Sequence, residues 1–234
     1  MTPTADVTLD VFSALIDSRS GASEVLDRIA AQQHWDMDGE DLYLAWDRAH
    51  KALQLACERW ESFATLGRRA LVHVLQVRKL SGDVDAAMAQ LWASLGDWPL
   101  WPDVEDGVHE LARHHRVGLL SNVDDGLLAR TRVASLPLAP GLIITSERAR
   151  AYKPRPPIYH AAQDIVGASL VHVAASARDV RGALEAGLET VRLARPGHEL
   201  DADGPRPARD VRSLTELAGL LRAAPRPASG NGLF

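Results

Sequence analysis

The chain has 234 residues, of which 46% are apolar and 24% charged, as in ordinary globular proteins, and it is long enough for one large domain or a core domain with an insertion. The formal net charge of −5 argues against a nucleic-acid-binding protein, and the single cysteine, Cys57, excludes an internal disulfide framework and a thiolate zinc cluster. No apolar run approaches the roughly 20 residues that span a bilayer and no signal-peptide pattern precedes the first strand, so we expect a cytoplasmic protein without a membrane partner.

The apolar pattern changes period along the chain. Residues 6–12 form a short apolar run that predicts a strand. Over residues 21–95 charged and apolar residues recur every three or four positions, which predicts several helices, and the prolines of residues 96–104 end this block. Strands are then expected at residues 116–122, 141–147, 170–176 and 189–195, and helices at residues 104–115, 124–136, 156–167, 177–187 and 211–224.

Strands that alternate with helices predict an α/β fold with a Rossmann-like parallel sheet and helices on both of its faces. The helical block between the first strand and the rest is then an inserted helical cap. We therefore expect a core domain formed by residues 1–15 and 97–222 and a cap domain formed by residues 16–96. The composition of residues 223–234 predicts a disordered tail.

Polar side chains follow four of the predicted strands. In an open parallel sheet, ligands bind beyond the carboxyl ends of the strands, so these side chains are expected to meet at one edge. Each residue by itself is more typical of a turn, a helix cap or a solvated surface, and their combination on one edge is what predicts a site. The residues are Asp10, Ser121, Asn122, Lys153, Ser176 and Asp179.

Four motifs, in this order, resemble the haloacid dehalogenase (HAD) superfamily. They are "TLDVFSAL", "GLLSNVDD", "AYKPRPPIYHAA" and "VHVAASARDVRGALEAG", and the resemblance runs from residue 6 to about residue 195. It implies the fold described above, with the carboxylate that follows the first strand as a nucleophile.

The resemblance is to the metal-independent dehalogenases of the superfamily and not to its phosphatases. A phosphatase of this kind carries a second aspartate two residues after the nucleophile, where this chain has Phe12, and a Gly-Asp pair where it has Ala174 and Ala175. Mg²⁺ prefers oxygen ligands, and these substitutions remove two carboxylates. We therefore expect no metal and no cofactor.

The resemblance to L-2-haloacid dehalogenases implies a role for each motif residue. Asp10 would displace halide from a short 2-haloalkanoic acid and form an ester, which water would hydrolyse to a 2-hydroxy acid. Lys153 would keep Asp10 ionised, and Asp179 with Ser176 would position the water. The residues expected to bind the substrate are Phe12, Ser121, Asn122, Arg48, Tyr159 and Arg178.

Three departures from the family pattern leave the activity open. This chain has Ala14 where the family has a threonine near the nucleophile. In the last motif it has Ala174 and Ser176 where the family has serine and asparagine. Its cap arginine aligns with Asp47, so Arg48 is a candidate only if the helix start is displaced, and a surface arginine is an equal interpretation. Arg178, at an aromatic position of the family, is a second candidate cation.

Other functions therefore stay open beside dehalogenation. They are opening of a carboxylated epoxide by the same aspartate, a phosphatase-like activity, and a superfamily member that binds without turnover. The tryptophans are interpreted mainly as packing residues of the cap. The expected partner is a small molecule, and a homodimer is compatible with the resemblance.

Overall fold

The computed structural model describes residues 5–167 and 170–223. Within them, six parallel strands form one sheet in the order β3-β2-β1-β4-β5-β6. This confirms the expected parallel α/β architecture. The strands are β1 (Asp6–Leu9), β2 (Arg116–Ser121), β3 (Ile143–Thr145), β4 (Leu170–Ala174), β5 (Glu189–Leu193) and β6 (Arg209–Val211).

The first strand lies at the centre of the sheet. Val7 and Leu9 are fully buried, as expected for a parallel strand that is covered on both faces. β1 pairs with β2 on one side and β4 on the other, and Leu9 is in register with Leu119 and Val173. The chain order of the strands therefore reverses at β1, which is the position where open parallel sheets bind ligands.

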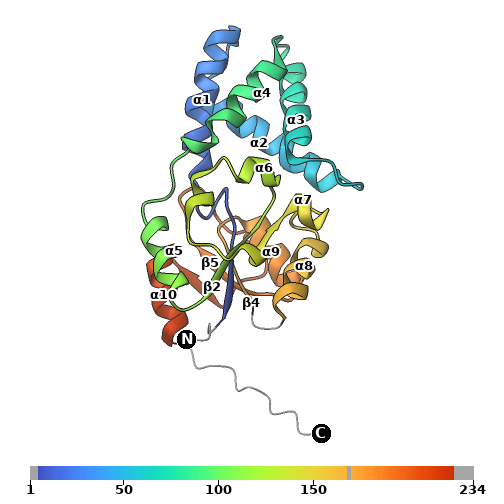
Figure 1. The fold of residues 1–234 in the computed structure, drawn as a ribbon. Coiled ribbons are helices and arrows are strands. Elements are labelled where there is room, and N and C mark those ends of the chain that lie inside the picture. The colour runs from blue at the N-terminus through green and yellow to red at the C-terminus, as the bar shows by residue number, and fades with distance from the viewer. Residues whose placement is uncertain (1–4, 168–169, 224–234) are drawn as a thin grey trace, which may run out of the picture.

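Helices cover both faces of the sheet (Figure 1). α5 and α10 pack against each other on one side, and α8 and α9 lie on the other. The helices of this part of the chain are α5 (Val104–Ala112), α6 (Asp125–Leu128), α7 (Ser146–Ala149), α8 (Pro156–Val166), α9 (Ala177–Glu185) and α10 (Leu214–Ala223).

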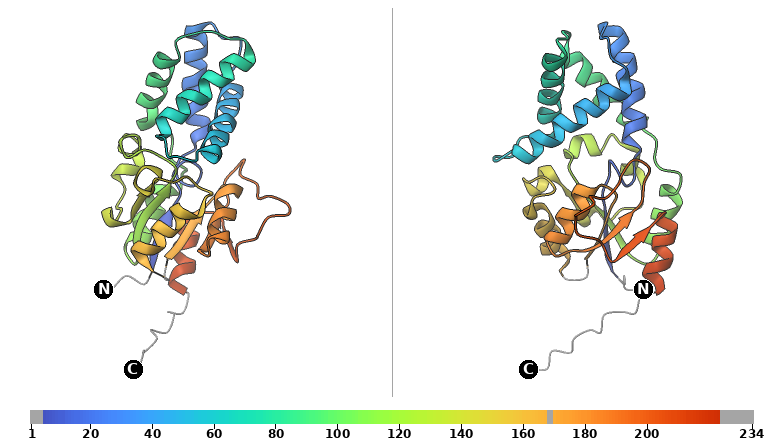
Figure 2. Two further views of the ribbon diagram at one scale, coloured as in Figure 1. Left: turned by 90° about the vertical axis from the view of Figure 1, so that its right-hand side faces the viewer. Right: turned by 180° about the vertical axis from the view of Figure 1, so that it is seen from behind.

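Four further helices form a separate layer beyond the carboxyl edge of the sheet (Figures 1 and 2). Each begins at a residue whose side chain accepts a hydrogen bond from a backbone amide of the first turn, the usual N-cap arrangement, at Asp17, Asp38, Ser62 and Asp83. We call this group the helical layer. It consists of α1 (Ser18–Gln33), α2 (Gly39–Ala56), α3 (Phe63–Arg78) and α4 (Val84–Ala93).

Charged side chains below the helical layer hold two of its helix ends. Asp124 accepts hydrogen bonds from the amides of Phe63 and Ala64, at 2.7 and 2.9 Å, at the N-terminus of α3. Arg155 donates to the carbonyls of Leu55 and Cys57, at 2.8 and 2.7 Å, at the C-terminus of α2. Both charges complement the partial charge of the helix end that they contact, so they favour the layer's position over the sheet.

Some element boundaries differ from those expected. The strand predicted at residues 6–12 ends at Leu9, because Asp10 starts a turn in which its carboxylate accepts from the amide of Ser13. The helix predicted at residues 124–136 is α6 followed by a 3₁₀ turn, with the break at Thr131, whose hydroxyl donates to Leu128 O at 2.8 Å. Polar side chains bonding to the local backbone explain both differences.

Two further differences concern the C-terminal part. β6 was not expected, because it is a three-residue edge strand that begins with two charged residues. The tail was expected at residues 223–234, but Ala223 belongs to α10. Residues 224–234 lie outside the described residues. Among the helices of the described ranges, none has the length and apolarity needed to cross a membrane.

Candidate active site

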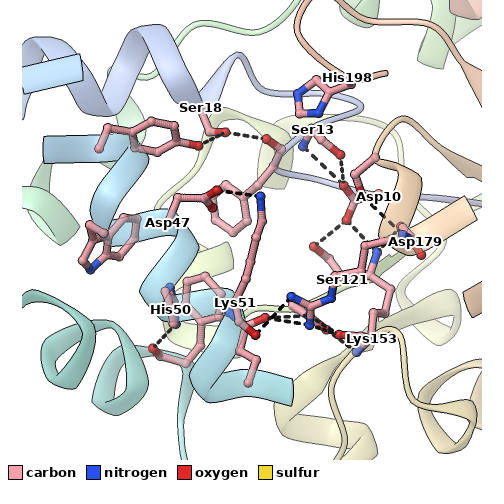
Figure 3. A pocket seen from close by; sticks show the side chains of 18 of the residues that line it. Asp10, Ser13, Ser18, Asp47, His50, Lys51, Ser121, Lys153, Asp179 and His198 are labelled. Atoms are coloured by element: carbon pink, nitrogen blue, oxygen red, sulfur yellow. Dashed lines mark hydrogen bonds and ion pairs between the residues drawn. The ribbon is translucent and has the colours of Figure 1, made fainter. Parts of the chain in front are cut away.

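The carboxylate of Asp10 lies at the carboxyl end of the central strand (Figure 3). The backbone amide of Asp10 continues the ladder to Val173 O at 3.0 Å, and the Asp10 side chain is only 10% exposed. Lys153, 4% exposed, donates from Nζ to Asp10 Oδ1 at 2.7 Å and to Leu120 O at 2.7 Å. The fold thus brings a carboxylate and an ammonium group into direct contact across 143 residues of sequence.

The electrostatics of this pair favour both charged forms. Burial opposes ionisation of Asp10, but the neighbouring Lys153 ammonium outweighs it and holds the pKa of the carboxyl below its ordinary value. Burial likewise opposes the charge on Lys153, and Asp10 and Asp179 together raise the pKa of its ammonium group. Asp10 is therefore an anion at neutral pH with little contact to bulk water.

A hydroxyl group that the sequence analysis missed orients the same carboxylate. Ser13 donates from Oγ to Asp10 Oδ2 at 2.7 Å and from its amide at 3.3 Å. Ala14 lacks the family's hydroxyl, and Ser13 supplies one from the preceding position. Ser121 adds a longer contact from its hydroxyl to Asp10 Oδ1, at 3.3 Å. The loss inferred at Ala14 is thus offset within the same turn.

Asp179 is the second carboxylate of the site and is more fully bound than the first. Its Oδ2 accepts from Lys153 Nζ at 2.5 Å, and its Oδ1 contacts the Tyr159 hydroxyl at 2.9 Å and His172 Nε2 at 3.2 Å. Thr8 completes the chain with a contact of 3.0 Å between its hydroxyl and His172 Nδ1. Burial would raise the pKa of Asp179, but Lys153 and His172 lower it well below the ordinary value.

Tyr159 lies behind this cluster and is not among the residues that line the cavity described below, which differs from the expected substrate contact. The side chain is fully buried, and its hydroxyl binds Asp179. Gly182 leaves room for it, since a Cβ there would lie 2.6 Å from the Tyr159 hydroxyl and 2.7 Å from Pro154 Cβ. Tyr159 therefore positions Asp179.

The backbone of Lys153 is held by three polar side chains. Asn122 accepts from the Lys153 amide at 2.8 Å and donates to its carbonyl at 3.1 Å. Arg178 donates to the same carbonyl. Gln54, from α2 and 4% exposed, accepts from Asn122 at 2.9 Å and from Arg178 at 3.3 Å. A residue of the helical layer thus joins the set that fixes Lys153.

A cavity of about 110 Å³ lies between this cluster and the helical layer. Its walls are rich in aromatic rings, and Phe12 stacks on Phe63 with a centroid distance of 5.8 Å. Three tryptophans that had been interpreted as packing residues also face it. The aromatic lining residues are Phe12, Tyr43, Trp46, Phe63, Trp92 and Trp98, and the expected site residues that reach it are Asp10, Phe12, Ser121, Asn122, Lys153, Ser176, Arg178 and Asp179.

The structure does not place Arg48 at the cavity. Arg48 is exposed on α2 and is not among the lining residues, because a shift of one residue turns a helical side chain by about 100°. Asp47 lines the cavity instead and pairs with Lys51, one turn further along α2, at 2.6 Å. The Lys51 side chain is 49% exposed, which places this ammonium group at the cavity opening.

The groups around Asp10 do not fit a magnesium ion. The Phe12 side chain offers no oxygen, and its backbone carbonyl already accepts from the Ser18 hydroxyl at 2.6 Å. Ala174 and Ala175 offer no side-chain ligand, and both oxygens of Asp179 are already bound by Lys153, Tyr159 and His172. Among residues 5–167 and 170–223, no cluster of three or more His, Cys, Asp and Glu side chains is arranged to hold a metal ion.

Comparison with known proteins points to one family, although no family model matches the chain. It is 25% identical over 220 residues to (S)-2-haloacid dehalogenase 4A of Burkholderia cepacia, covering 91% of this chain and 92% of the relative. It is 27% identical over 201 residues to (S)-2-haloacid dehalogenase of Xanthobacter autotrophicus, covering 82% and 76%.

Solved structures show the same fold. The L-2-haloacid dehalogenase from Xanthobacter autotrophicus superimposes with a TM-score of 0.80 at 20% identity, over 94% of this chain and 99% of that one. A defluorinating L-2-haloacid dehalogenase gives a TM-score of 0.80 at 24% identity, over 94% and 95%. By sequence the chain is similar to (S)-2-haloacid dehalogenases, and by fold it is similar to the L-2-haloacid dehalogenases of known structure.

Proposed function

We propose that the protein is a hydrolase that displaces halide from short 2-haloalkanoic acids. One observation carries this proposal: the ionised, buried Asp10 carboxylate, held by Lys153 at 2.7 Å, borders a small cavity with aromatic walls. A carboxylate with little hydration is a stronger nucleophile toward saturated carbon than one in bulk water. A carboxylate oxygen of Asp10 attacks C2 of the substrate, the carbon–halogen bond breaks, and halide leaves as an ester forms.

Water completes the reaction. Its oxygen bonds to Cγ of Asp10, the bond between Cγ and the ester oxygen breaks, and a 2-hydroxy acid leaves with inverted configuration. Lys153 and Ser13 each contact one oxygen of this carboxyl group, so both are placed to stabilise negative charge that develops there. In this proposal, Asp179 and Ser176 position the water.

The cavity supports a small anionic substrate. A dry cavity of about 150 Å³ accommodates benzene, so about 110 Å³ suits an acid of two or three carbons. Lys51 at the opening and Arg178, which also lines the cavity, supply positive charge for the substrate carboxylate. Arg178 already donates to backbone carbonyls of Lys153 and Lys51, so in this proposal Lys51 contacts the carboxylate directly.

Incubation with a panel of short 2-haloacids tests the proposal. We expect release of chloride or bromide by the wild-type protein and none by Asp10→Asn. In H₂¹⁸O, intact-protein mass spectrometry should show label entering the Asp10 carboxylate over many turnovers. Absence of halide release across the whole panel would refute the proposed function.

A carboxylated epoxide is the second candidate. The observation in its favour is the charged Asp47–Lys51 pair on the cavity wall, which is more polar than a simple haloalkanoate requires. Asp10 would open the epoxide and form an ester without releasing halide. The same mass-spectrometric assay with carboxylated epoxides separates the two substrates.

We further propose that the helical layer is the inserted cap domain, residues 16–96, over a core of residues 1–15 and 97–222. Asp124 and Arg155 of the core bind helix ends of the layer, and Gln54 of α2 binds Asn122 of the core; these contacts between the two parts support this division. A cytoplasmic location and a homodimer stay predictions, and sedimentation of the purified protein tests the second.

A further inference from the structure

Hydrolysis of the proposed ester needs a group that accepts a proton from water. Asp179 is poorly suited to this task, although it lies next to Asp10. Both of its oxygens are bound, by Lys153, Tyr159 and His172, and its pKa lies far below the ordinary carboxyl value because the nearby positive charge outweighs burial. A carboxylate held in this way is a weak base.

Most other titratable groups on the cavity wall are also engaged. Asp47 pairs with Lys51 at 2.6 Å. His50 Nε2 contacts Phe63 O at 3.1 Å, and burial lowers the pKa of this imidazole to about 3. Burial and the charge of Asp47 raise the pKa of Tyr43 well above its ordinary value, so its hydroxyl stays protonated. None of these groups is a good base at neutral pH.

His198 is the remaining imidazole on the wall. It lies in the connection between β5 and β6, lines the cavity, and stands beside Ser13 and Asp10 in Figure 3. Its backbone is fixed, since its amide donates to Arg195 O at 3.2 Å and its carbonyl accepts from Arg192 at 3.0 Å. Within the described residues, no hydrogen bond to its ring is found.

Arg195 fixes this connection to the turn that holds the nucleophile. Its side chain, 5% exposed, donates to Ala14 O at 3.0 Å and to Asp103 at 2.6 Å. His198 follows three residues later, so its ring is held close to the Asp10–Ala14 turn. Burial and the charge of Lys51 lower the pKa of His198, against the opposing effect of Asp10, which leaves the ring neutral and able to accept a proton.

We propose that His198 is the general base of the hydrolytic step, an inference that rests on the proposed dehalogenase function. The imidazole removes a proton from water as the water oxygen bonds to Cγ of Asp10. When the bond between Cγ and the ester oxygen breaks, the departing oxygen of the 2-hydroxy acid takes that proton from the imidazolium. This restores neutral His198 and leaves the second proton of the water on the Asp10 carboxyl group. That proton passes to solvent, as the proton released together with halide in the overall reaction, and the Asp10 carboxylate is restored.

Substitution of His198 by Gln and by Asn tests this role, with His160→Gln, an exposed histidine of α8, as the matched control. The assay mixes each protein with a haloacid that the wild type turns over and follows halide release and intact mass together. We expect the first turnover to release halide as in the wild type, and the ester on Asp10 then to accumulate. Steady-state kcat should fall by about 10²-fold or more, and added imidazole should restore part of it in His198→Ala.

Three outcomes would overturn the inference. If His198→Gln and His198→Asn both keep the wild-type kcat and accumulate no ester on Asp10, another group accepts the proton. Loss of the first halide burst in variants that keep the wild-type thermal unfolding would assign His198 to alkylation instead. A wild-type protein that releases no halide from any acid would refute the proposed function itself. This result needs no variant, so it is distinct from a failure of the inference about His198.

Discussion

Replacement of Lys153 by methionine isolates the interaction on which the site depends. The ammonium group contacts Asp10 at 2.7 Å and Asp179 at 2.5 Å, and all three side chains are nearly inaccessible. Methionine retains the aliphatic volume and removes the charge, which leaves two buried carboxylates without their shared cation. Breaking a buried ion pair by removal of one partner costs roughly 3–5 kcal/mol, because the remaining charge has lost both water and its counter-charge.

The effect should depend on pH with a defined sign. In the wild type, Lys153 outweighs burial and holds the pKa of Asp10 below that of the unfolded chain. Such a group contributes stability above the unfolded-state pKa and loses it as pH falls through the folded-state pKa. Without Lys153, burial acts alone and raises the pKa of Asp10, so ionisation then costs stability as pH rises. The deficit of Lys153→Met should therefore be largest near neutrality and shrink as pH falls below about 4, the ordinary range of a carboxyl group.

Urea unfolding at several pH values measures this deficit as the difference in free energy of unfolding between wild type and variant. Lys79→Met, at an exposed lysine, is the matched control. The double variant Asp10→Asn, Lys153→Met should recover part of the loss, because it removes an unpaired anion together with its cation. A deficit below about 0.5 kcal/mol at pH 7, or one that does not change with pH, would refute the proposed coupling.

Three smaller predictions concern groups around the nucleophile. Ser13→Ala should slow the first halide burst by about 10²-fold, because it removes the hydroxyl that orients Asp10. The double variant Ser13→Gly, Ala14→Thr should retain much of the rate. Equal burst rates in Ser13→Ala and wild type would contradict this role. Arg178→Met should lower the free energy of unfolding by about 1.5–3 kcal/mol in urea titrations, since it removes charged donors that bridge core and helical layer, and an unchanged midpoint would count against that bridge. Arg48→Ala should leave kcat/KM within about twofold of the wild type in the haloacid assay, because the side chain is exposed outside the cavity, and a tenfold loss would reopen the expected role of this arginine.

The sequence was sufficient to predict the meeting of Asp10, Lys153 and Asp179, for a topological reason. Parallel strands present their carboxyl ends at one edge, so residues that follow β1 and β4 are neighbours whatever their separation in the chain. The turn after β1 was harder to predict, because its hydroxyl is on Ser13, one residue before the family's threonine position at Ala14. Ser13, next to Ala14 in the family's threonine position, was the available signal, and only the turn geometry shows that this hydroxyl reaches Asp10.

The helical layer was less predictable because its site residues depend on helical phase. Trp46, His50 and Gln54 recur every four residues on the buried face of α2. A histidine and a glutamine in an otherwise apolar stripe are unusual, since buried polar groups need partners, and here the partners are Phe63 O for His50 and Asn122 with Arg178 for Gln54.

That phase also places Asp47 and Lys51 on the adjacent stripe at the cavity and Arg48 in solvent. The family motifs led to Arg48 and Arg178 as candidate cations and gave no indication of the Asp47–Lys51 pair. The two buried polar residues of α2 therefore identify the face of the helical layer that meets the nucleophile, and they do so independently of any family pattern.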